Sequence, residues 1–91
     1  MPNEEAQVPE EGKLIGKITH YFGGIGVAVI ELEDTLRVGD TIRIIGGTTD
    51  FTQAIESMEM EHKKIDEAKA GESIGLKVTE KVREGYKVYK L

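Results

Sequence analysis

Short runs rich in Ile, Val and Thr, separated by turns that contain glycine, fill the sequence from residue 14 to residue 91. Apolar and polar side chains alternate in several of these runs, as where Ala28, Ile30 and Leu32 share one face. A period of two is typical of antiparallel strands, whereas a helix repeats every 3.6 residues. We expect strands at residues 14–21, 27–32, 41–45, 52–60, 73–79 and 86–91, with a bulge near residues 56–57 and a loop over 60–70 anchored by Ile65.

A weak internal repeat supports this organisation. A glycine is followed three residues later by a β-branched residue at Gly39, Gly71 and Gly85, which is the spacing of a turn that leads into a strand. Many short strands with open edges would invite aggregation, and closing the sheet removes those edges. We therefore predict an all-β fold, a small closed antiparallel β-barrel of six or seven strands.

Charge is unevenly distributed along the chain. The whole sequence has 12 Lys and Arg against 17 Asp and Glu, a net charge of -5. Residues 1–12 contain four Glu, two Pro and no basic residue, so we expect a disordered acidic tail there and a single domain over residues 13–91. Residues 77–91 have five basic and two acidic side chains, which fits either a solvated strand surface or a patch that faces phosphate.

Several kinds of chemistry find no support in the residues. The chain has no Cys, which excludes disulfides, zinc ribbons and thiol nucleophiles. The glycine cluster at residues 23–26 is not followed by the Lys of a phosphate-binding loop, and the two His lie 42 residues apart with no legible catalytic arrangement. No apolar run exceeds four residues. We expect no enzyme, no cofactor, no metal, no membrane segment and a cytoplasmic location.

The aromatic residues suggest where a ligand could bind. Tyr86 and Tyr89 lie among Lys77, Lys81 and Arg83, the closest approach in this sequence to a base-stacking platform. Phe51 is either an exposed interface anchor at the tip of a loop or part of the core. With the residues discussed next, the candidate binding set is Glu59, His62, Ser73, Lys77, Lys81, Arg83, Tyr86, Tyr89 and Phe51.

The order of three segments resembles a known family. Residues 36–46 contain Val38-Gly39-Asp40 before a strand, residues 57–60 read Ser-Met-Glu-Met, and residues 68–76 contain Ala70-Gly71 before another strand. In this order and spacing they resemble domain II of translational GTPases such as elongation factor Tu, over residues 24–91. The resemblance implies a closed barrel of the translation-protein type. The G domain of those proteins is absent from this sequence, so no GTP is expected.

The same resemblance implies candidate binding residues. In elongation factor Tu this barrel helps to hold the aminoacylated 3′ end of tRNA; Glu59 matches an acidic residue at the terminal ribose and Ser73 a small polar residue near the aminoacyl group. Lys77 stands where that family packs an apolar residue on the adenine, and Glu61-His62 replaces an aromatic-basic pair. The sequence departs from the family at both places.

Two functions follow as alternatives. The first is a non-enzymatic binding module associated with translation, with tRNA, ribosomal RNA or a translation factor as partner. The second is a protein–protein adaptor that presents a strand edge or the loop at residues 48–51 and has no nucleic-acid role. The oligomeric state is left open.

Overall fold

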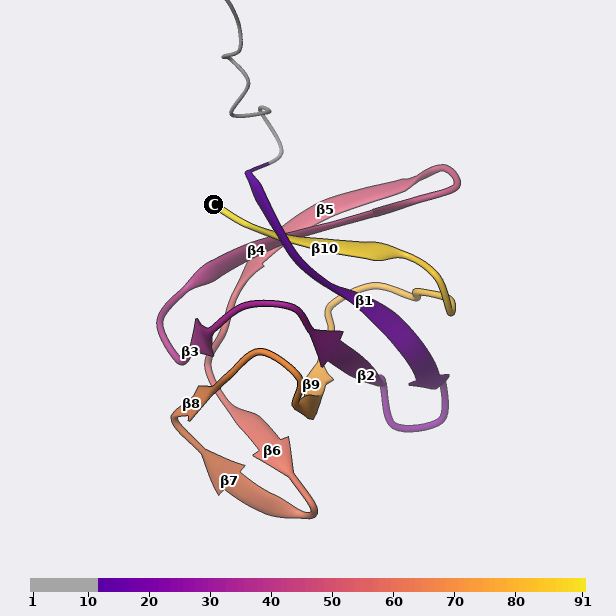
Figure 1. Cartoon of the computed structure of the whole chain (residues 1–91). Coiled ribbons are helices and arrows are strands. Elements are labelled where there is room, and N and C mark those ends of the chain that lie inside the picture. The colour runs from indigo at the N-terminus through magenta and orange to yellow at the C-terminus, as the bar shows by residue number, and fades with distance from the viewer. Residues whose placement is uncertain (1–11) are drawn as a thin grey trace, which may run out of the picture.

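The computed structural model describes residues 12–91, and all of the regular structure in them is β-strand (Figure 1). The predicted acidic tail, residues 1–12, lies outside the described residues except for Gly12. The strands are β1 (Lys13–Phe22), β2 (Val27–Leu32), β3 (Leu36–Arg37), β4 (Thr41–Gly46), β5 (Thr49–Ala54), β6 (Met58–Met60), β7 (Lys63–Ile65), β8 (Glu67–Ala68), β9 (Ser73–Lys77) and β10 (Lys87–Lys90). Within residues 12–91 no helix is long and apolar enough to cross a membrane.

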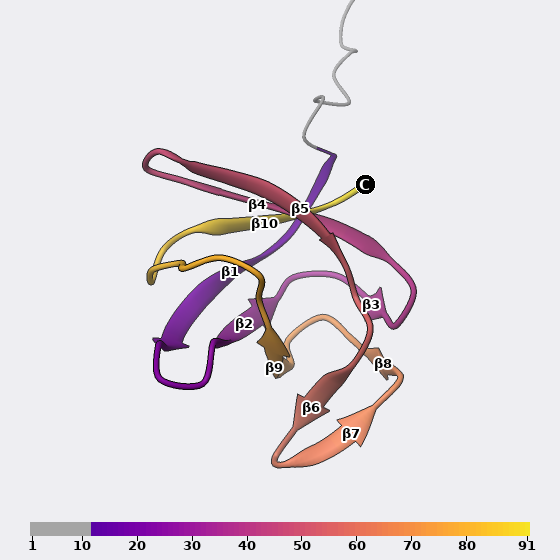
Figure 2. The same cartoon turned by 180° about the vertical axis from the view of Figure 1, so that it is seen from behind.

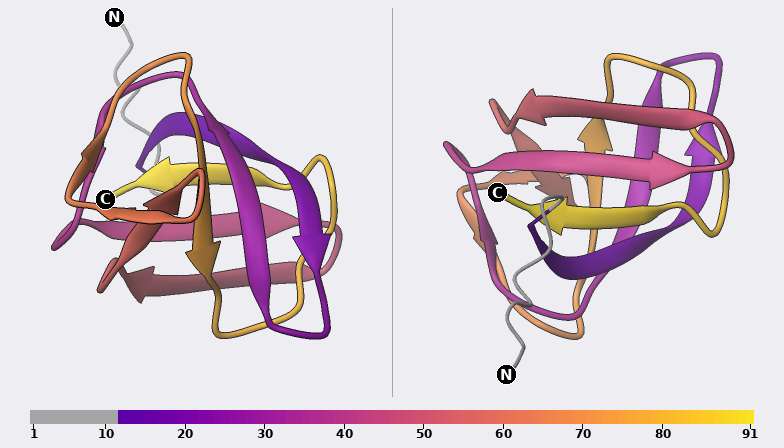
Figure 3. Two further views of the ribbon diagram at one scale, coloured as in Figure 1. Left: turned by 90° about the horizontal axis from the view of Figure 1, so that it is seen from below. Right: turned by 90° about the horizontal axis from the view of Figure 1, so that it is seen from above.

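The strands form two antiparallel sheets. Eight strands pair in the order β5-β4-β10-β1-β2-β9-β6-β7, and β3 pairs with β8 separately. Figures 2 and 3 show the larger sheet curving so that its strands surround a common interior. The pairing in residues 12–91 thus establishes an all-β antiparallel fold, but it does not join the end strands β5 and β7 to each other.

The core occupies the concave side of this curved sheet. Ala28, Ile30 and Leu32 are all buried, as the alternation of β2 predicts. They pack with Ile18 of β1 and Ile44 of β4 in a single cluster that draws residues from strands all around the sheet. At about 25 cal/mol per Å² of buried apolar surface, such a cluster is the main stabilising contribution to the fold.

Phe51 belongs to this core. It lies on β5 opposite Ile44 and is only 8% exposed. Of the two alternatives that the sequence left open for this ring, the structure has the core position, so Phe51 does not present its side chain to a partner.

The segment from residue 52 to residue 70 differs from the prediction. A single strand with a bulge was expected, but the chain leaves the sheet after Ala54, where the N–H of Ile55 donates to the carbonyl of Asp40, 2.8 Å away. The expected loop over residues 60–70 instead holds β7 and β8. Because these strands are only two or three residues long and mostly exposed, they lack the alternation that a sequence pattern detects.

One side chain links the end strand β5 to the far part of the sheet. The amide of Gln53 donates to the carbonyl of Lys77 and accepts from the N–H of Thr79, both at 2.9 Å. The two bonds connect β5 to the last residue of β9 and to the segment that follows it.

Candidate functional site

The structure distributes the predicted binding residues over two separate hollows in the surface. Glu59, His62 and Ser73 meet in an apolar groove, while Lys81, Arg83 and Tyr86 line a polar cleft. The remaining predicted residues line neither hollow: Lys77, Tyr89 and Phe51. Of the two rings of the predicted Tyr86–Tyr89 platform, Tyr86 lines the polar cleft, whereas Tyr89 lies within β10 opposite Arg43 and lines neither hollow.

The apolar groove lies between the β1–β2 hairpin and the β6–β7 hairpin and has a volume of about 430 Å³. Val27 and Val29 of β2, Met60 of β6 and Gly75 of β9 contribute to its lining. A side chain at Gly75 would begin 3.6 Å from Val27 Cγ1, so its absence keeps this part of the groove open.

Two large apolar side chains at the groove are strongly exposed. Phe22 is 47% exposed and Ile25 is 65% exposed, and both line the groove from the β1–β2 hairpin. The Phe22 ring also contacts the His20 ring, with centroids 4.3 Å apart. Single exposed apolar residues are common, but two that border one apolar hollow are typical of a binding surface.

The β6–β7 turn at the edge of the groove has an unusual backbone. Met60 pairs with Lys63, which leaves Glu61 and His62 as a two-residue turn, with φ of 53° and 68°. Such turns favour Asn-Gly, because other L-residues pay about 1–2 kcal/mol for each left-handed conformation. Backbone strain of this kind is concentrated at functional sites. Here it places Glu61 and His62 at the groove, beside Glu59.

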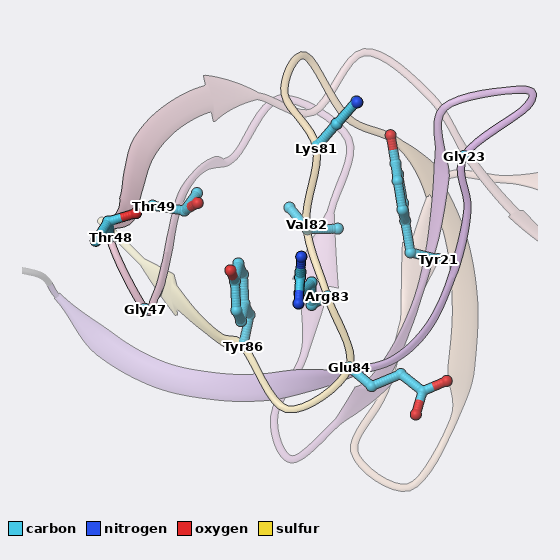
Figure 4. A pocket seen from close by; sticks show the side chains of 10 residues that line it. All are labelled: Tyr21, Gly23, Gly47, Thr48, Thr49, Lys81, Val82, Arg83, Glu84 and Tyr86. Atoms are coloured by element: carbon cyan, nitrogen blue, oxygen red, sulfur yellow. The ribbon is translucent and has the colours of Figure 1, made fainter.

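The polar cleft is built from three segments that are far apart in the sequence (Figure 4). Tyr21 and Gly23 come from the end of β1 and the turn after it, residues 47–49 from the β4–β5 hairpin, and residues 81–84 and 86 from the loop before β10. The cleft is open to solvent and has a volume of about 920 Å³. Its size is within the range of ligand sites in proteins.

Gly46 provides the space for one wall of the cleft. A Cβ atom at Gly46 would lie 2.2 Å from Cδ1 of Tyr86, so the Tyr86 ring occupies the volume that a side chain would need. Gly47 follows with φ of 56°, and its position lies close to the Tyr86 hydroxyl. The absence of side chains at these two glycines lets the Tyr86 ring pack directly against the β4–β5 hairpin.

The loop that carries the cationic residues of the cleft is firmly fixed. Val82 is only 3% exposed and anchors the loop in the core. The N–H of Gly85 donates to the carbonyl of Ile18 at 2.7 Å, and the N–H of Ile18 donates to the carbonyl of Tyr86 at 2.8 Å. Lys81 and Arg83 therefore flank a buried residue, and the backbone that follows Arg83 is hydrogen-bonded to β1.

The carboxylate in the cleft already has a partner. Glu84 Oε2 lies 3.4 Å from Nδ1 of His20. Among residues 12–91, neither Lys81 nor Arg83 takes part in an ion pair. The described residues also contain no group of three or more His, Asp and Glu that could hold a metal ion.

Two carboxyl groups elsewhere have shifted pKa values. Arg43 donates hydrogen bonds of 2.7 and 2.6 Å to Asp50, and these bonds lower the pKa of that carboxyl group below its usual value. The hydrogen bond from Lys13 and a second from the N–H of Thr35 lower the pKa of Asp34. The first pair connects β4 to β5, the second connects the start of β1 to the turn after β2, and both lie outside the two hollows.

This geometry defines a small all-β fold with two hollows on its surface. The family model for elongation factor Tu domain 2 matches residues 35–88, more than half of the chain. The chain belongs to this family, and the resemblance inferred from its ordered motifs is confirmed.

The similar proteins are named as proteases. The chain is 44% identical over 78 residues to an uncharacterized protease, MJ0090, of Methanocaldococcus jannaschii, covering 85% of this chain and 19% of that protein. It is 38% identical over 78 residues to a collagenase of Porphyromonas gingivalis, covering 84% and 22%. The chain thus spans about a fifth of the length of these relatives.

A solved structure has the same fold. The C-terminal domain of a U32 peptidase from Geobacillus thermoleovorans matches with a TM-score of 0.81, over 87% of this chain and 92% of that one. Its sequence identity is 23%, which supports a common fold and no more.

These relatives overturn the predicted translation role. The prediction of an RNA-binding module with tRNA, ribosomal RNA or a translation factor as partner is wrong, because the similar proteins are named as peptidases. The error has a physical origin: the motifs that carry the resemblance are turns followed by strands, which specify a fold, whereas function depends on the surface residues around it.

The sequence reasoning also missed the apolar residues of the groove. The alternation puts Val27 and Val29 on one face of their strand without showing whether that face is core, and Phe22 and Ile25 were not singled out. Ile25 offered a signal, since an apolar side chain within a glycine-rich hairpin turn has no core to enter.

Proposed function

We propose that this chain is an accessory domain of a U32-type peptidase and that its groove binds an extended segment of polypeptide. The observation that carries the proposal is the apolar groove, which occurs in a domain whose relatives are named as proteases. In this proposal the domain binds polypeptide and takes no catalytic step itself.

The groove suits a particular kind of segment. Covering an apolar side chain of Leu or Phe size contributes about 1.5–3 kcal/mol, and two such side chains give weak but useful binding after the entropy of ordering is subtracted. Glu59 and Glu61 at the groove are both acidic. The preferred segment is therefore apolar with a Lys or Arg beside it, since opposite charge improves encounter and orientation.

The test uses the exposed residues of the groove, because their replacement leaves the core intact. A labelled, unfolded peptide of alternating Leu and Ser with one terminal Arg is titrated with the chain while fluorescence anisotropy is recorded. Phe22→Ser and Ile25→Ser are each expected to weaken binding at least about fivefold. Leu91→Ser is the matched control, because Leu91 is 54% exposed and lies outside the groove.

Equal losses in all three variants, or no binding by the unmodified chain, would refute the proposal. Denatured collagen is a second probe, chosen because one relative is named a collagenase. Its binding should show the same dependence on Phe22 and Ile25.

We also propose that residues 13–91 form a single domain whose curved sheet is closed as a barrel. The two hydrogen bonds of Gln53, which connect β5 to the segment after β9, support this finer description. The single core cluster shared by strands all around the sheet supports it as well. A closed frame would fix both hairpins that border the groove.

A further inference from the structure

We propose that the polar cleft binds the free C-terminal carboxylate of a polypeptide. The cleft brings together side chains that donate hydrogen bonds: the cations Lys81 and Arg83, and hydroxyl groups of Tyr and Thr (Figure 4). A carboxylate accepts several such bonds, and a guanidinium group can hold it with two parallel bonds.

The charges in the cleft favour an anion. Two cationic side chains lie there against one carboxylate, Glu84, which has His20 beside it at 3.4 Å. Lys81 and Arg83 form no ion pair within residues 12–91, so binding an anion would not first require breaking one. Val82 is buried between the two cations, and the carbonyl of Arg83 accepts from the N–H of Tyr86 at 3.2 Å, which limits the backbone entropy that Arg83 loses on binding.

The walls of the cleft favour an anion that carries an organic group. Tyr21, Tyr86 and Val82 line the cleft beside the cations. Inorganic phosphate would use the charges and leave these walls uncovered. The last residue of a polypeptide has its side chain on the carbon next to the carboxylate. Its carboxylate can therefore bind the cations while its side chain packs against the walls of the cleft.

This inference rests on the proposed function for the choice of a polypeptide as the ligand. Hydrolysis adds water across the C–N bond of a peptide and leaves a new C-terminal carboxylate on one fragment. A domain that accompanies a peptidase would meet such ends as products, or as substrates if the peptidase acts from the C-terminus.

The groove and the cleft use different residues of the same hairpin. Phe22 and Ile25 line the groove, whereas Tyr21 and Gly23 line the cleft. Tyr21 and Phe22 are adjacent on β1 and point to opposite faces, which explains the division for these two residues. Variants of one hollow should therefore leave the other intact.

The experiment compares labelled Gly-Ser peptides that end in Leu, either with a free carboxylate or with a C-terminal amide. The free carboxylate should bind the chain at least about tenfold more tightly than the amide, as expected for a charge-assisted interaction. Arg83→Gln and Lys81→Gln should remove most of this difference. Lys69→Gln, which also removes one positive charge but lies outside the cleft, should retain it.

Equal binding of the acid and the amide would overturn the inference. The inference also fails if an amidated peptide with an internal Asp binds as tightly as the peptide with a free C-terminal carboxylate, because any carboxylate would then suffice. It fails as well if an equal concentration of inorganic phosphate displaces the peptide. If Phe22→Ser weakens the groove peptide while Arg83→Gln changes nothing, this inference alone fails. If Arg83→Gln removes the preference for the free carboxylate while Phe22→Ser leaves binding of the groove peptide unchanged, the groove proposal alone fails.

Discussion

Replacing Gly46 with Ala tests how the wall of the cleft is built. The new Cβ would lie 2.2, 2.3 and 2.7 Å from three ring atoms of Tyr86, where about 3.5–4.0 Å is the ordinary contact between carbon atoms. The ring must move by more than about 1 Å, although it is packed against the core. Overpacking of this kind costs about 1–3 kcal/mol.

Part of that cost is recovered, because Ala restricts the unfolded chain more than Gly does, by about 0.4–1 kcal/mol. The net loss in the free energy of unfolding should be about 1–2 kcal/mol. In a domain of this size it corresponds to a decrease in Tm of roughly 5–15 °C. Thermal unfolding followed by circular dichroism at pH 7 measures it.

A double-mutant cycle with Tyr86→Ala identifies the cause. Without the ring, Gly46→Ala should cost nothing or stabilise slightly, so the coupling between the two changes should account for the whole effect. Gly24→Ala is the control, because a side chain there would meet nothing within 4 Å, and its effect should stay within about 0.5 kcal/mol. A cost that persists in the Tyr86→Ala background would refute this account of the glycine.

Two further changes address the groove turn and the acid range. In the double variant Glu61→Asn, His62→Gly, the free energy of unfolding measured by urea titration should increase by about 1 kcal/mol, because Asn and Gly adopt the positive φ that the turn requires. An unchanged urea midpoint would show that the turn stores no strain. For Asp50→Asn, the lowered pKa of the carboxyl group means that its stabilising effect is present above the unfolded value of about 3.9 and is lost as the pH falls through the lower folded value. The variant should therefore be less stable than the unmodified chain at pH 7, and this difference should decrease as the pH falls through the lowered pKa of Asp50. A stability difference that does not vary with pH would contradict the Arg43–Asp50 explanation.

Much of the fold was predictable because its signals are local. The alternation predicted that Ala28, Ile30 and Leu32 share one face, which the structure shows to be the core face, and the glycine turns marked where strands begin. The β6–β7 hairpin was not predictable in this way. Its turn, Glu61-His62, lacks the Asn-Gly signature, and its strands are too short to show a period.

The sequence alone could not show which residues line the same hollow. The groove joins Phe22 to Met60, and the cleft joins Tyr21 to Thr48 and Arg83. These residues meet only because β9 lies between β2 and β6, and β10 between β1 and β4. Glu59 and Arg83 were both predicted as candidate binding residues, but no local pattern shows that they line different hollows.

The arrangement of charge around the β1–β2 hairpin adds a direction to the proposed binding. The groove has the carboxylates Glu59 and Glu61, and the cleft has the cations Lys81 and Arg83. A polypeptide that spans the hairpin would place a basic residue of its apolar segment at the groove and its terminal carboxylate in the cleft. The reversed chain would bring its ammonium end to the cations and lose both interactions. Residues 12–91 have 12 basic and 13 acidic side chains, so their net charge is close to zero although the groove is acidic and the cleft is basic. Two hollows of opposite charge would select one direction of the bound chain.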